Sequence, residues 1–266
     1  MIRLGQHFLR DESAIEEIVN AVGVAPDDTI IEIGPGRGAL TEKLKTQISI
    51  RRLADKTARL IAVEKDGALA HALETVFKQD THVEVIHGDA LMELPAIVSR
   101  VRGAYKVVGN IPYYITGKLF RTLSELDPPP LRCVFTVQRE VAERIAAAPP
   151  HMNLLGLSTQ AWATPHILRI LPPGAFSPPP AVHSAVIALE RITRISPILS
   201  HFPILKAGFS HPRKLLINNL AEGLSIPKKS LLRAWSVLGL SPGVRAQELS
   251  LVQWEKLASL STVNRP

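Results

Sequence analysis

The chain has 266 residues but only one cysteine, and it lacks any long hydrophobic run. A single thiol forms no internal disulfide, and Cys133 lies in the apolar stretch CVFTV, so we expect a buried, inert side chain. No stretch reaches the roughly 18 consecutive apolar residues of a membrane span. The opening MIRLGQHFLRDES has polar residues where a signal peptide has its apolar core. These absences predict a cytoplasmic protein that does not enter a membrane.

Positive charge is concentrated near the C-terminus. The formal net charge is +7, and residues 191–266 carry eleven Lys or Arg, three Glu and no Asp, which is a net charge of +8. Residues 1–190 therefore sum to −1. A solvated helical surface accounts for part of such an excess, but charge of one sign on a small segment favours contact with phosphate groups.

Strand-like and helix-like patterns alternate through the first two thirds of the chain. The strand-like runs are TIIEI (29–33), RLIAVE (59–64), VEVIHGD (83–89), YKVVGN (105–110) and RCVFTVQ (132–138). Helical spacing of apolar residues is found over 11–22, 39–45, 67–77, 116–126 and 140–147. This alternation predicts a parallel sheet with helices on both faces. Two later runs, HILRIL (166–171) and SAVIALE (184–190), have no helix between them and predict an antiparallel pair at the sheet edge.

The pattern changes after about Arg194. Strand signals stop, and the remaining sequence predicts short helices separated by prolines. Three earlier proline clusters, 128–130, 149–150 and 178–180, mark loops because proline fits neither helix interiors nor central strands. We therefore expect a first domain over residues 1–193 and a small helical domain over residues 194–266, whose basic charge favours a partner with phosphate groups.

A glycine-rich turn follows the first predicted strand. In TIIEIGPGRGALTEKL, the residues Gly34, Gly36 and Gly38 lie where the backbone turns sharply and can approach a ligand closely. Taken alone, the turn favours a nucleotide-type ligand, although similar turns bind dinucleotides or serve only the fold.

The next two predicted strands end in acidic residues. Glu64 is suited to accept both hydroxyls of a ribose, and Asp89 is suited to accept from an adenine amine. Ligands of open parallel sheets lie beyond the carboxyl ends of the strands, so these acids should meet the glycine turn in one crevice. Helix capping or simple exposure is the alternative for either acid alone. Glu64 follows Gly34 by 30 positions, against about 20 in dehydrogenases, which disfavours a nicotinamide cofactor. The basic stretch 45–59 is expected to hold the extra loop.

The fourth predicted strand ends in the tetrapeptide NIPY, residues 110–113. An exocyclic aromatic amine is a poor nucleophile, so an enzyme that methylates it must hold its N–H bonds in a productive geometry. The Asn110 side-chain oxygen and a carbonyl of Ile111 or Pro112 are able to accept those hydrogens. Tyr113 offers a ring on which the base can stack, and no charged general base is needed. An ordinary loop with a half-buried tyrosine is the alternative.

Seven motifs together resemble the ribosomal RNA adenine N6,N6-dimethyltransferases, most closely their bacterial small-subunit branch. They are GQHFL (5–9), IEIGPGRGALTE (31–42), VEKD (63–66), HGDAL (87–91), GNIPYYIT (109–116), FTVQREVAERI (135–145) and AFSPPPAVHSAVI (175–187). The resemblance implies an α/β fold, a class I methyltransferase Rossmann-like domain with a mixed seven-stranded sheet, followed by a small helical domain. It also implies dimethylation of two adjacent adenines near the 3′ end of 16S ribosomal RNA (rRNA) in the small (30S) subunit, and a role in ribosome biogenesis.

The resemblance assigns roles to individual residues. The cofactor S-adenosyl-L-methionine should contact His7, Leu9, Gly34, Gly36, Glu64, Asp89 and Asn110. The target base should be held by Asn110 and Tyr113, with Phe176 on its other face, so that an extruded adenine lies between two rings. From the residues alone, Phe176 would instead be a core aromatic and His7 a surface residue. No metal ligand is assigned.

Some positions depart from the family pattern. His7 stands where asparagine is usual, which introduces a pH-sensitive group. Ala181 and His183 replace a base and an acid near the expected RNA surface. The segment FSHPRKLLINNL (209–220) has fewer positive charges than its counterpart, which leaves Arg213 and Lys214 for RNA binding.

Alternatives to a 16S rRNA dimethyltransferase come from three classes. One is a 23S rRNA adenine methyltransferase of the macrolide-resistance type, which the PPP loop and the segment 209–220 disfavour. Another is a non-catalytic RNA-binding assembly factor, which would be expected to lose the NIPY tetrapeptide. A dehydrogenase is the weakest. We expect a monomer.

Overall fold

The computed structural model describes residues 7–50 and 58–262, and contacts divide these residues into two units. The N-terminal unit runs to Ala142 and resumes over Pro165–Arg191, and the C-terminal unit comprises Glu143–Thr164 and the residues from Ile192 onward. The change at Arg191 lies close to the domain boundary predicted at residue 193. The segment 143–164, predicted in the first domain, groups by its contacts with the C-terminal helices, because Leu157 and Ala161 belong to their core.

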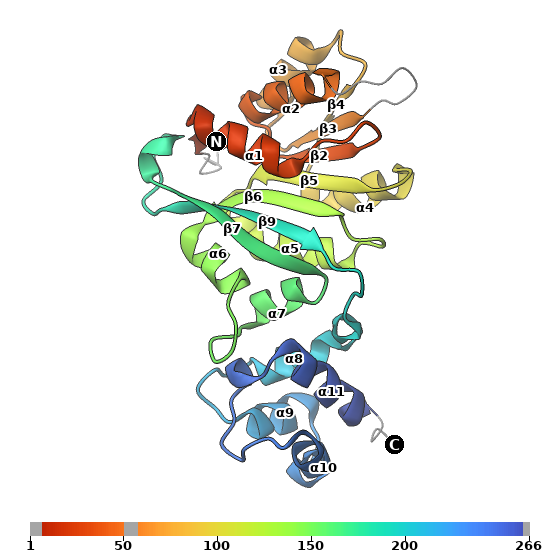
Figure 1. Cartoon of the computed structure of the whole chain (residues 1–266), viewed down its shortest axis with the longest axis vertical. Coiled ribbons are helices and arrows are strands. Elements are labelled where there is room, and N and C mark those ends of the chain that lie inside the picture. The colour runs from red at the N-terminus through yellow and green to blue at the C-terminus, as the bar shows by residue number, and fades with distance from the viewer. Residues whose placement is uncertain (1–6, 51–57, 263–266) are drawn as a thin grey trace. The chain divides into compact units, whose positions relative to one another are not determined.

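Seven strands form one mixed sheet in the order β4-β3-β2-β5-β6-β9-β7 (Figure 1). Their bounds are β2 Thr29–Ile33, β3 Arg59–Glu64, β4 Val83–His87, β5 Tyr105–Asn110, β6 Arg132–Gln138, β7 Ala163–Leu171 and β9 Ser184–Arg191. Strands β4, β3, β2, β5 and β6 are parallel, and β9 runs antiparallel to β6. This sheet confirms the predicted fold class. Strands β9 and β7 lie next to each other at one edge, where the sequence predicted an added pair.

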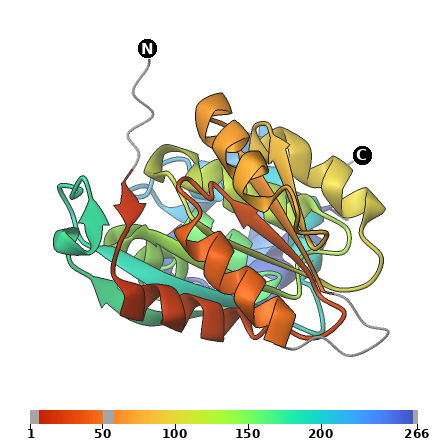
Figure 2. The same ribbon diagram turned by 90° about the horizontal axis from the view of Figure 1, so that it is seen from above.

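Helices cover both faces of the sheet. Helix α1 (Glu12–Val22) lies beside α2 (Ala39–Ile50) on one face of the sheet (Figures 1 and 2). The core on this face includes Val134 of β6. Side chains alternate along a strand, so Phe135 faces the other side, where Phe120 of α5 packs against it with ring centroids 5.5 Å apart. The remaining helices of the N-terminal unit are α3 Gly67–Phe77, α4 Ala90–Arg100, α5 Thr116–Glu125 and the first part of α6 Arg139–Ile145, with the short 3-10 helices η1 Tyr113–Ile115 and η2 Pro173–Ala175.

The parallel register brings the carboxyl ends of the central strands to one edge. Ile33 at the end of β2 lies opposite Val63 of β3 and Gly109 of β5. The residues that follow these three are Gly34, Glu64 and Asn110, which therefore share one crevice.

The sequence pattern missed several elements. Helix α4 continues through Pro95, which the pattern counts as a break, and its bounds were not predicted. Two short strands, β1 (Phe8–Leu9) and β8 (Phe176–Ser177), pair antiparallel in a separate ribbon. Helix α2 extends to Ile50, beyond the helix predicted over 39–45 and into the stretch 45–59 that was expected to hold a loop. Residues 51–57 of that expected loop lie outside the described residues.

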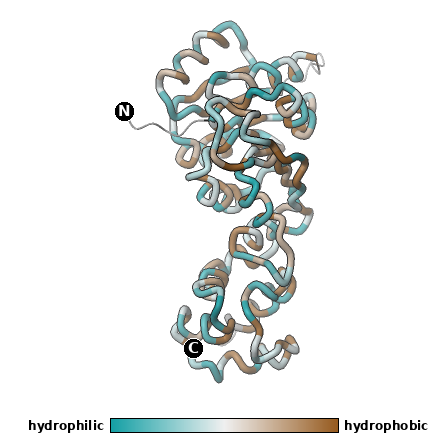
Figure 3. The backbone as a smooth tube through the Cα atoms, turned by 90° about the vertical axis from the view of Figure 1, so that its left-hand side faces the viewer, coloured by the Kyte–Doolittle hydropathy of each residue, from teal (hydrophilic) through white to brown (hydrophobic). Residues whose placement is uncertain are grey.

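The C-terminal unit has its own core. Its elements are the end of α6, α7 Leu154–Gln160, η3 Pro197–His201, α8 Phe202–Gly208, α9 Leu216–Leu224, α10 Lys228–Leu238, η4 Ala246–Glu248 and α11 Leu251–Thr262. Trp235 and Trp254 are buried in this core with Leu216 and Leu220. Apolar and polar residues alternate along these helices, as helices with one buried face require (Figure 3).

None of the helices in residues 7–50 and 58–262 is long and apolar enough to cross a membrane.

Candidate active site

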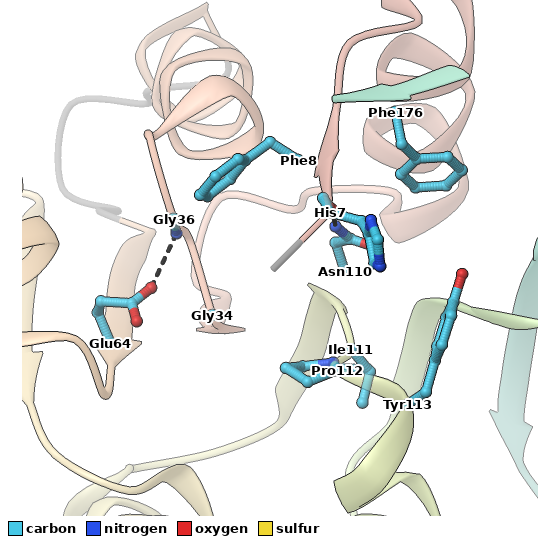
Figure 4. A pocket seen from close by; sticks show the side chains of 10 residues that line it. All are labelled: His7, Phe8, Gly34, Gly36, Glu64, Asn110, Ile111, Pro112, Tyr113 and Phe176. Atoms are coloured by element: carbon cyan, nitrogen blue, oxygen red, sulfur yellow. Dashed lines mark hydrogen bonds between the residues drawn. The ribbon is translucent and has the colours of Figure 1, made fainter. Parts of the chain in front are cut away.

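A pocket at the carboxyl edge of the sheet brings together most of the predicted site residues (Figure 4). It is lined by His7, Phe8, Gly34, Gly36, Glu64, Asn110, Ile111, Pro112, Tyr113 and Phe176. In Figure 4 the glycine turn and Glu64 lie at one end of the pocket, and the rings of His7, Tyr113 and Phe176 gather at the other. Of the predicted cofactor and base contacts, only Leu9 and Asp89 lie outside this lining.

The glycine turn needs glycine for its conformation and for its neighbours. Gly34 and Gly36 have φ angles of +65° and +59°, which L-residues rarely adopt. A Cβ on Gly36 would also lie 2.8 Å from the Phe8 ring. The close approach of the β1 segment therefore depends on a bare backbone at this turn.

Backbone amides hold Glu64 at one end of the pocket. Its side chain is buried, and its two carboxylate oxygens accept from Gly36 N and Asp66 N, each at 2.9 Å. A carboxylate oxygen has two lone pairs, so both oxygens retain capacity for further donors such as hydroxyl groups. The amides fix the direction in which that remaining capacity points.

An adjoining pocket contains Asp89. It shares Gly34, Glu64 and Pro112 with the first pocket and adds Lys65 and Tyr114. Asp89 is the N-cap of α4, and its Oδ1 accepts from Leu91 N at 3.0 Å. The helix-capping role considered as an alternative is therefore present, and Asp89 also lines this pocket. Its Oδ2 accepts from Lys65 Nζ at 2.8 Å, and this hydrogen bond lowers the pKa of Asp89. The pocket therefore presents an ionised acceptor.

Asn110 is oriented by the N-terminal segment. Its Nδ2 donates to the carbonyl oxygen of His7 at 2.7 Å. The His7 ring is itself fixed, because Nδ1 lies 2.7 Å from the carbonyl oxygen of Pro178, which can only accept, so Nδ1 must carry the hydrogen. With its amide nitrogen engaged, Asn110 has its Oδ1 available as an acceptor.

Aromatic rings frame the other end of the pocket. His7 and Tyr113 are stacked, with centroids 6.2 Å apart and planes at 27°. The Tyr113 hydroxyl forms a 2.9 Å hydrogen bond with Ser184 Oγ. Phe176 is buried, belongs to the core beneath α1, and also lines the pocket. The core role that the residues alone suggested for Phe176 and a place in the site are therefore compatible.

A third pocket, which shares Phe8, Gly34 and Asn110 with the first, includes Leu9 and an acid that the sequence analysis did not single out. Its lining includes Leu9, Gly34, Asn110, Arg37 and Glu32. Glu32 is 1% exposed, and its Oε2 has no hydrogen-bond partner among the described residues. Burial, followed by the like charge of Glu64, raises the pKa of Glu32 to about 8.

Sequence reasoning missed four residues of this region. Phe8 stands between His7 and Leu9 in GQHFL, and no sequence pattern places its ring against the glycine turn, where a Cβ on Gly36 would meet it. Glu32, Lys65 and Ser184 lie within quoted motifs, but only the folded chain shows what each of them touches. Gly5 and Gln6 of the first motif lie outside the described residues.

The predicted RNA-binding residues belong to the C-terminal unit. Arg213 and Lys214 are exposed in the loop between α8 and α9, and Lys214 Nζ lies 3.0 Å from Glu222 Oε2. Ala181 and His183, which depart from the family pattern, are exposed in the N-terminal unit.

Sequence comparison identifies one family. Residues 1–247 match the family described as ribosomal RNA adenine dimethylase. Proteins named ribosomal RNA small subunit methyltransferase A are 38% identical in Dehalococcoides mccartyi (strain 195), over 98% of this chain and 88% of that protein, and 40% identical in Synechococcus sp. (strain CC9605), over 96% and 94%.

Solved structures share the fold. A dimethyladenosine transferase from Plasmodium falciparum superposes with a TM-score of 0.77 at 22% identity, covering 94% of this chain and 96% of the other. The 23S rRNA methyltransferase ErmE superposes with a TM-score of 0.69 at 22% identity, covering 96% and 99%. At these identities the likeness shows the fold alone.

Proposed function

The chain belongs to the ribosomal RNA adenine dimethylase family, and from this premise we propose that it dimethylates the N6 amines of two adjacent adenines near the 3′ end of 16S rRNA. Its cofactor is S-adenosylmethionine, which supplies an electrophilic methyl group on a sulfonium. The relatives at 38–40% identity carry a small-subunit name, which supports 16S over 23S rRNA as the substrate.

The residues present fit this cofactor. Gly34 and Gly36 leave the turn without side chains, and a Cβ on Gly36 would fill space that Phe8 already occupies. We assign the ribose hydroxyls to the amide-braced carboxylate of Glu64 and the adenine amine to Asp89. His7 and Leu9 would complete the enclosure from the β1 segment, whose two neighbouring pockets both include Gly34 and Asn110.

The observation that carries the chemistry is the hydrogen bond from Asn110 Nδ2 to the His7 carbonyl. It supports Asn110 Oδ1 as the acceptor for one hydrogen of the target amine. The second acceptor would be the carbonyl of Ile111 or Pro112; that of Pro112 also accepts from Ile115 N at 3.1 Å and retains one lone pair. Two acceptors would draw electron density onto the amine nitrogen and aim its lone pair, which is the positioning that this poor nucleophile needs.

The aromatic end of the pocket suits an extruded base. Tyr113 is partly exposed and Phe176 is buried, and both line the same pocket as Asn110. We propose that the target adenine leaves its helix or strand and stacks on Tyr113, with Phe176 on its other face. The proton lost from the amine after transfer would pass to water, so no charged base is required.

The finer partner assignments are also proposals. We propose that the protein acts as a monomer in the cytoplasm, on 16S rRNA within the small ribosomal subunit, and that its basic C-terminal domain, residues 194–266, contacts RNA through Arg213 and Lys214. The net charge of +8 over residues 191–266 supports an anionic partner.

Replacing Asn110 with alanine tests the chemistry. Asn110→Ala should lower methyl transfer to unmethylated small-subunit particles by at least about a hundredfold, as the loss of one oriented polar group does elsewhere. Calorimetry should show that cofactor binding is retained. Asn20→Ala, which removes an exposed amide on α1, is the matched control and should leave turnover unchanged.

The outcomes separate the possible functions. Unchanged turnover in Asn110→Ala would refute the role of this side chain. A wild-type protein that prefers naked 23S rRNA to small-subunit particles would assign the macrolide-resistance type of activity. Binding to small-subunit particles without any transfer by the wild type would indicate a non-catalytic assembly factor.

A further inference from the structure

A buried serine touches the ring on which the proposed function stacks the target base. The Tyr113 hydroxyl lies 2.9 Å from Ser184 Oγ, although the residues are 71 positions apart in the chain. Tyr113 opens η1 after β5, and Ser184 is the first residue of β9. Ser184 is fully buried, whereas Tyr113 is partly exposed to the pocket.

Ser184 is a fixed support. It lies opposite Gln138 in the antiparallel pairing of β6 with β9, and the preceding residue, His183, accepts through its carbonyl from Arg139 N at 3.0 Å. A serine side chain has one rotatable bond to its oxygen, so a backbone held by the pairing with β6 keeps the hydroxyl within a small volume.

The ring needs such a support for stacking. A tyrosine ring has two rotatable bonds to the backbone, and a partner on its hydroxyl removes the freedom to swing. Stacking energies depend on the angle and offset of the rings. His7, which is stacked with Tyr113 at 6.2 Å, would otherwise be the only ring contact that sets this angle among the described residues.

The segment 176–184 contributes at both of its ends. Phe176 lines the pocket directly, the Pro178 carbonyl binds His7 Nδ1, and Ser184 binds Tyr113. Three of the four aromatic rings that line the pocket, those of His7, Tyr113 and Phe176 but not Phe8, therefore belong to this stretch of nine residues or contact it (Figure 4). The motif AFSPPPAVHSAVI (175–187) therefore supplies or contacts the rings that would surround the target base. Within it, Ser184 is a residue to which the sequence analysis assigned no role.

We propose that Ser184 is a positioning residue for the target base, because its hydroxyl holds the Tyr113 ring at the angle at which an unpaired adenine stacks. The proposal rests on the proposed adenine methylation. If the hydrogen bond only gave a buried hydroxyl a partner, its loss would lower the stability of the fold but would not change kcat/KM for the RNA substrate.

A double-mutant cycle tests this coupling. Ser184→Ala and Tyr113→Phe each remove the same hydrogen bond from opposite sides. Each should lower kcat/KM for unmethylated small-subunit particles by about five- to tenfold, the usual effect of one neutral hydrogen bond. The double variant should be no worse than the single ones, and calorimetry should find cofactor affinity unchanged in all three.

The matched control is Thr136→Val. Thr136 is an equally buried hydroxyl residue on the neighbouring strand β6, and its Oγ1 has no partner among the described residues. This substitution keeps the shape of the side chain and should leave kcat/KM unchanged. Tyr113→Phe alters only the hydroxyl of a partly exposed ring, so it keeps the test open even if Ser184→Ala folds poorly.

Two outcomes would overturn the proposal. One is an unchanged kcat/KM in Ser184→Ala, and the other is a double variant whose loss equals the product of the single losses. If the wild type transfers methyl groups and Asn110→Ala does not, either outcome rejects only the role of Ser184. If the wild type methylates no adenine, the proposed function itself fails.

Discussion

Single side chains at the carboxyl edge of the sheet serve the fold and the site together. Asp89 caps α4 with one oxygen and binds Lys65 with the other, and Glu64 accepts two backbone amides. Asn110 uses its nitrogen to hold the His7 carbonyl. In each case the structural bond fixes the orientation of the polar atom that remains. The site is therefore preorganised by hydrogen bonds within the protein itself.

Glu32 makes the stability of the fold depend on pH. Its pKa is raised by burial from 4.5 to about 8, so between these values the folded chain keeps a proton that the unfolded chain releases. Stability should therefore fall as pH rises through this window. Glu32→Gln should remove the dependence and gain up to about 1.4 kcal/mol per pH unit relative to the wild type, levelling off above pH 8.

Thermal unfolding of the cofactor-free protein at several pH values checks this expectation. Glu42→Gln, an exposed change on α2, is the control and should not gain stability in this way. A constant difference between Glu32→Gln and the wild type from pH 5 to pH 9 would show that Glu32 is ionised in the folded chain throughout.

The sequence predicted site residues that can be recognised by their type and their position at a strand end. It did not predict residues whose role depends on a contact with a part of the chain that is distant in sequence. Glu64 and Asn110 end strands, so their meeting follows from the parallel order. Ser184 matters only because β9 pairs with β6 and brings it to Tyr113. Glu32 resembles an ordinary polar residue in TIIEI until the sheet buries it on both sides. Long-range pairing of this kind leaves no periodic signal in the chain.

At the scale of elements, the spacing of β2 and β5 depends on Gly109. A Cβ at this position would collide with the carbonyl oxygen of Ile33 on the adjacent strand. The two strands lead into Gly34 and Asn110, so the same close approach brings the glycine turn next to NIPY.

Gly109→Ala should destabilise the protein by about 1–3 kcal/mol, because the backbone of β2 cannot give way without breaking the ladder. Gly117→Ala in α5 is the matched control, since nothing lies within 4 Å of its added Cβ, and it should be neutral or stabilise by up to about 1 kcal/mol. Urea unfolding followed by circular dichroism measures both. Equal effects of the two substitutions would remove the argument for close strand packing.

Elements with a clear period were predicted well, and those without one were not. Strands β2, β3, β5 and β6 have the predicted bounds because long aliphatic runs are buried on both faces. Helix α4 was not predicted because it contains Pro95, and a proline normally interrupts a helix. The helix nevertheless begins after its N-cap, Asp89, six residues before this proline, and continues through it. The two-residue strands β1 and β8 are too short for any pattern and exist only because they pair with each other.

At the scale of the whole molecule, the uneven charge of the chain predicts salt-sensitive binding to RNA. Replacing both Arg213 and Lys214 with glutamine should reduce the slope of log affinity against log salt by about 1.5, from two fewer displaced counterions. Arg213 should account for more of this change, because Lys214 is paired with Glu222. Filter binding to small-subunit RNA over a range of salt concentrations measures the slope.

The control for this measurement is glutamine at Lys78 and Arg100, two exposed cations of the N-terminal unit. Arg100 is paired with Glu84, as Lys214 is with Glu222, so the control matches both charge and pairing. An unaltered slope in the Arg213 and Lys214 variant would place the RNA on another surface of the protein.

Because Cys133 is buried, the rate at which a thiol reagent labels it measures the opening of the sheet. This sulfur is fully buried in β6, between β5 and β9, and burial raises the pKa of its thiol. A thiol reagent will reach it only when these strands separate, and the chain has no second cysteine to confuse the signal. The rate of labelling under native conditions thus reports how often β6 separates from β5 and β9, and an added cofactor analogue should slow it.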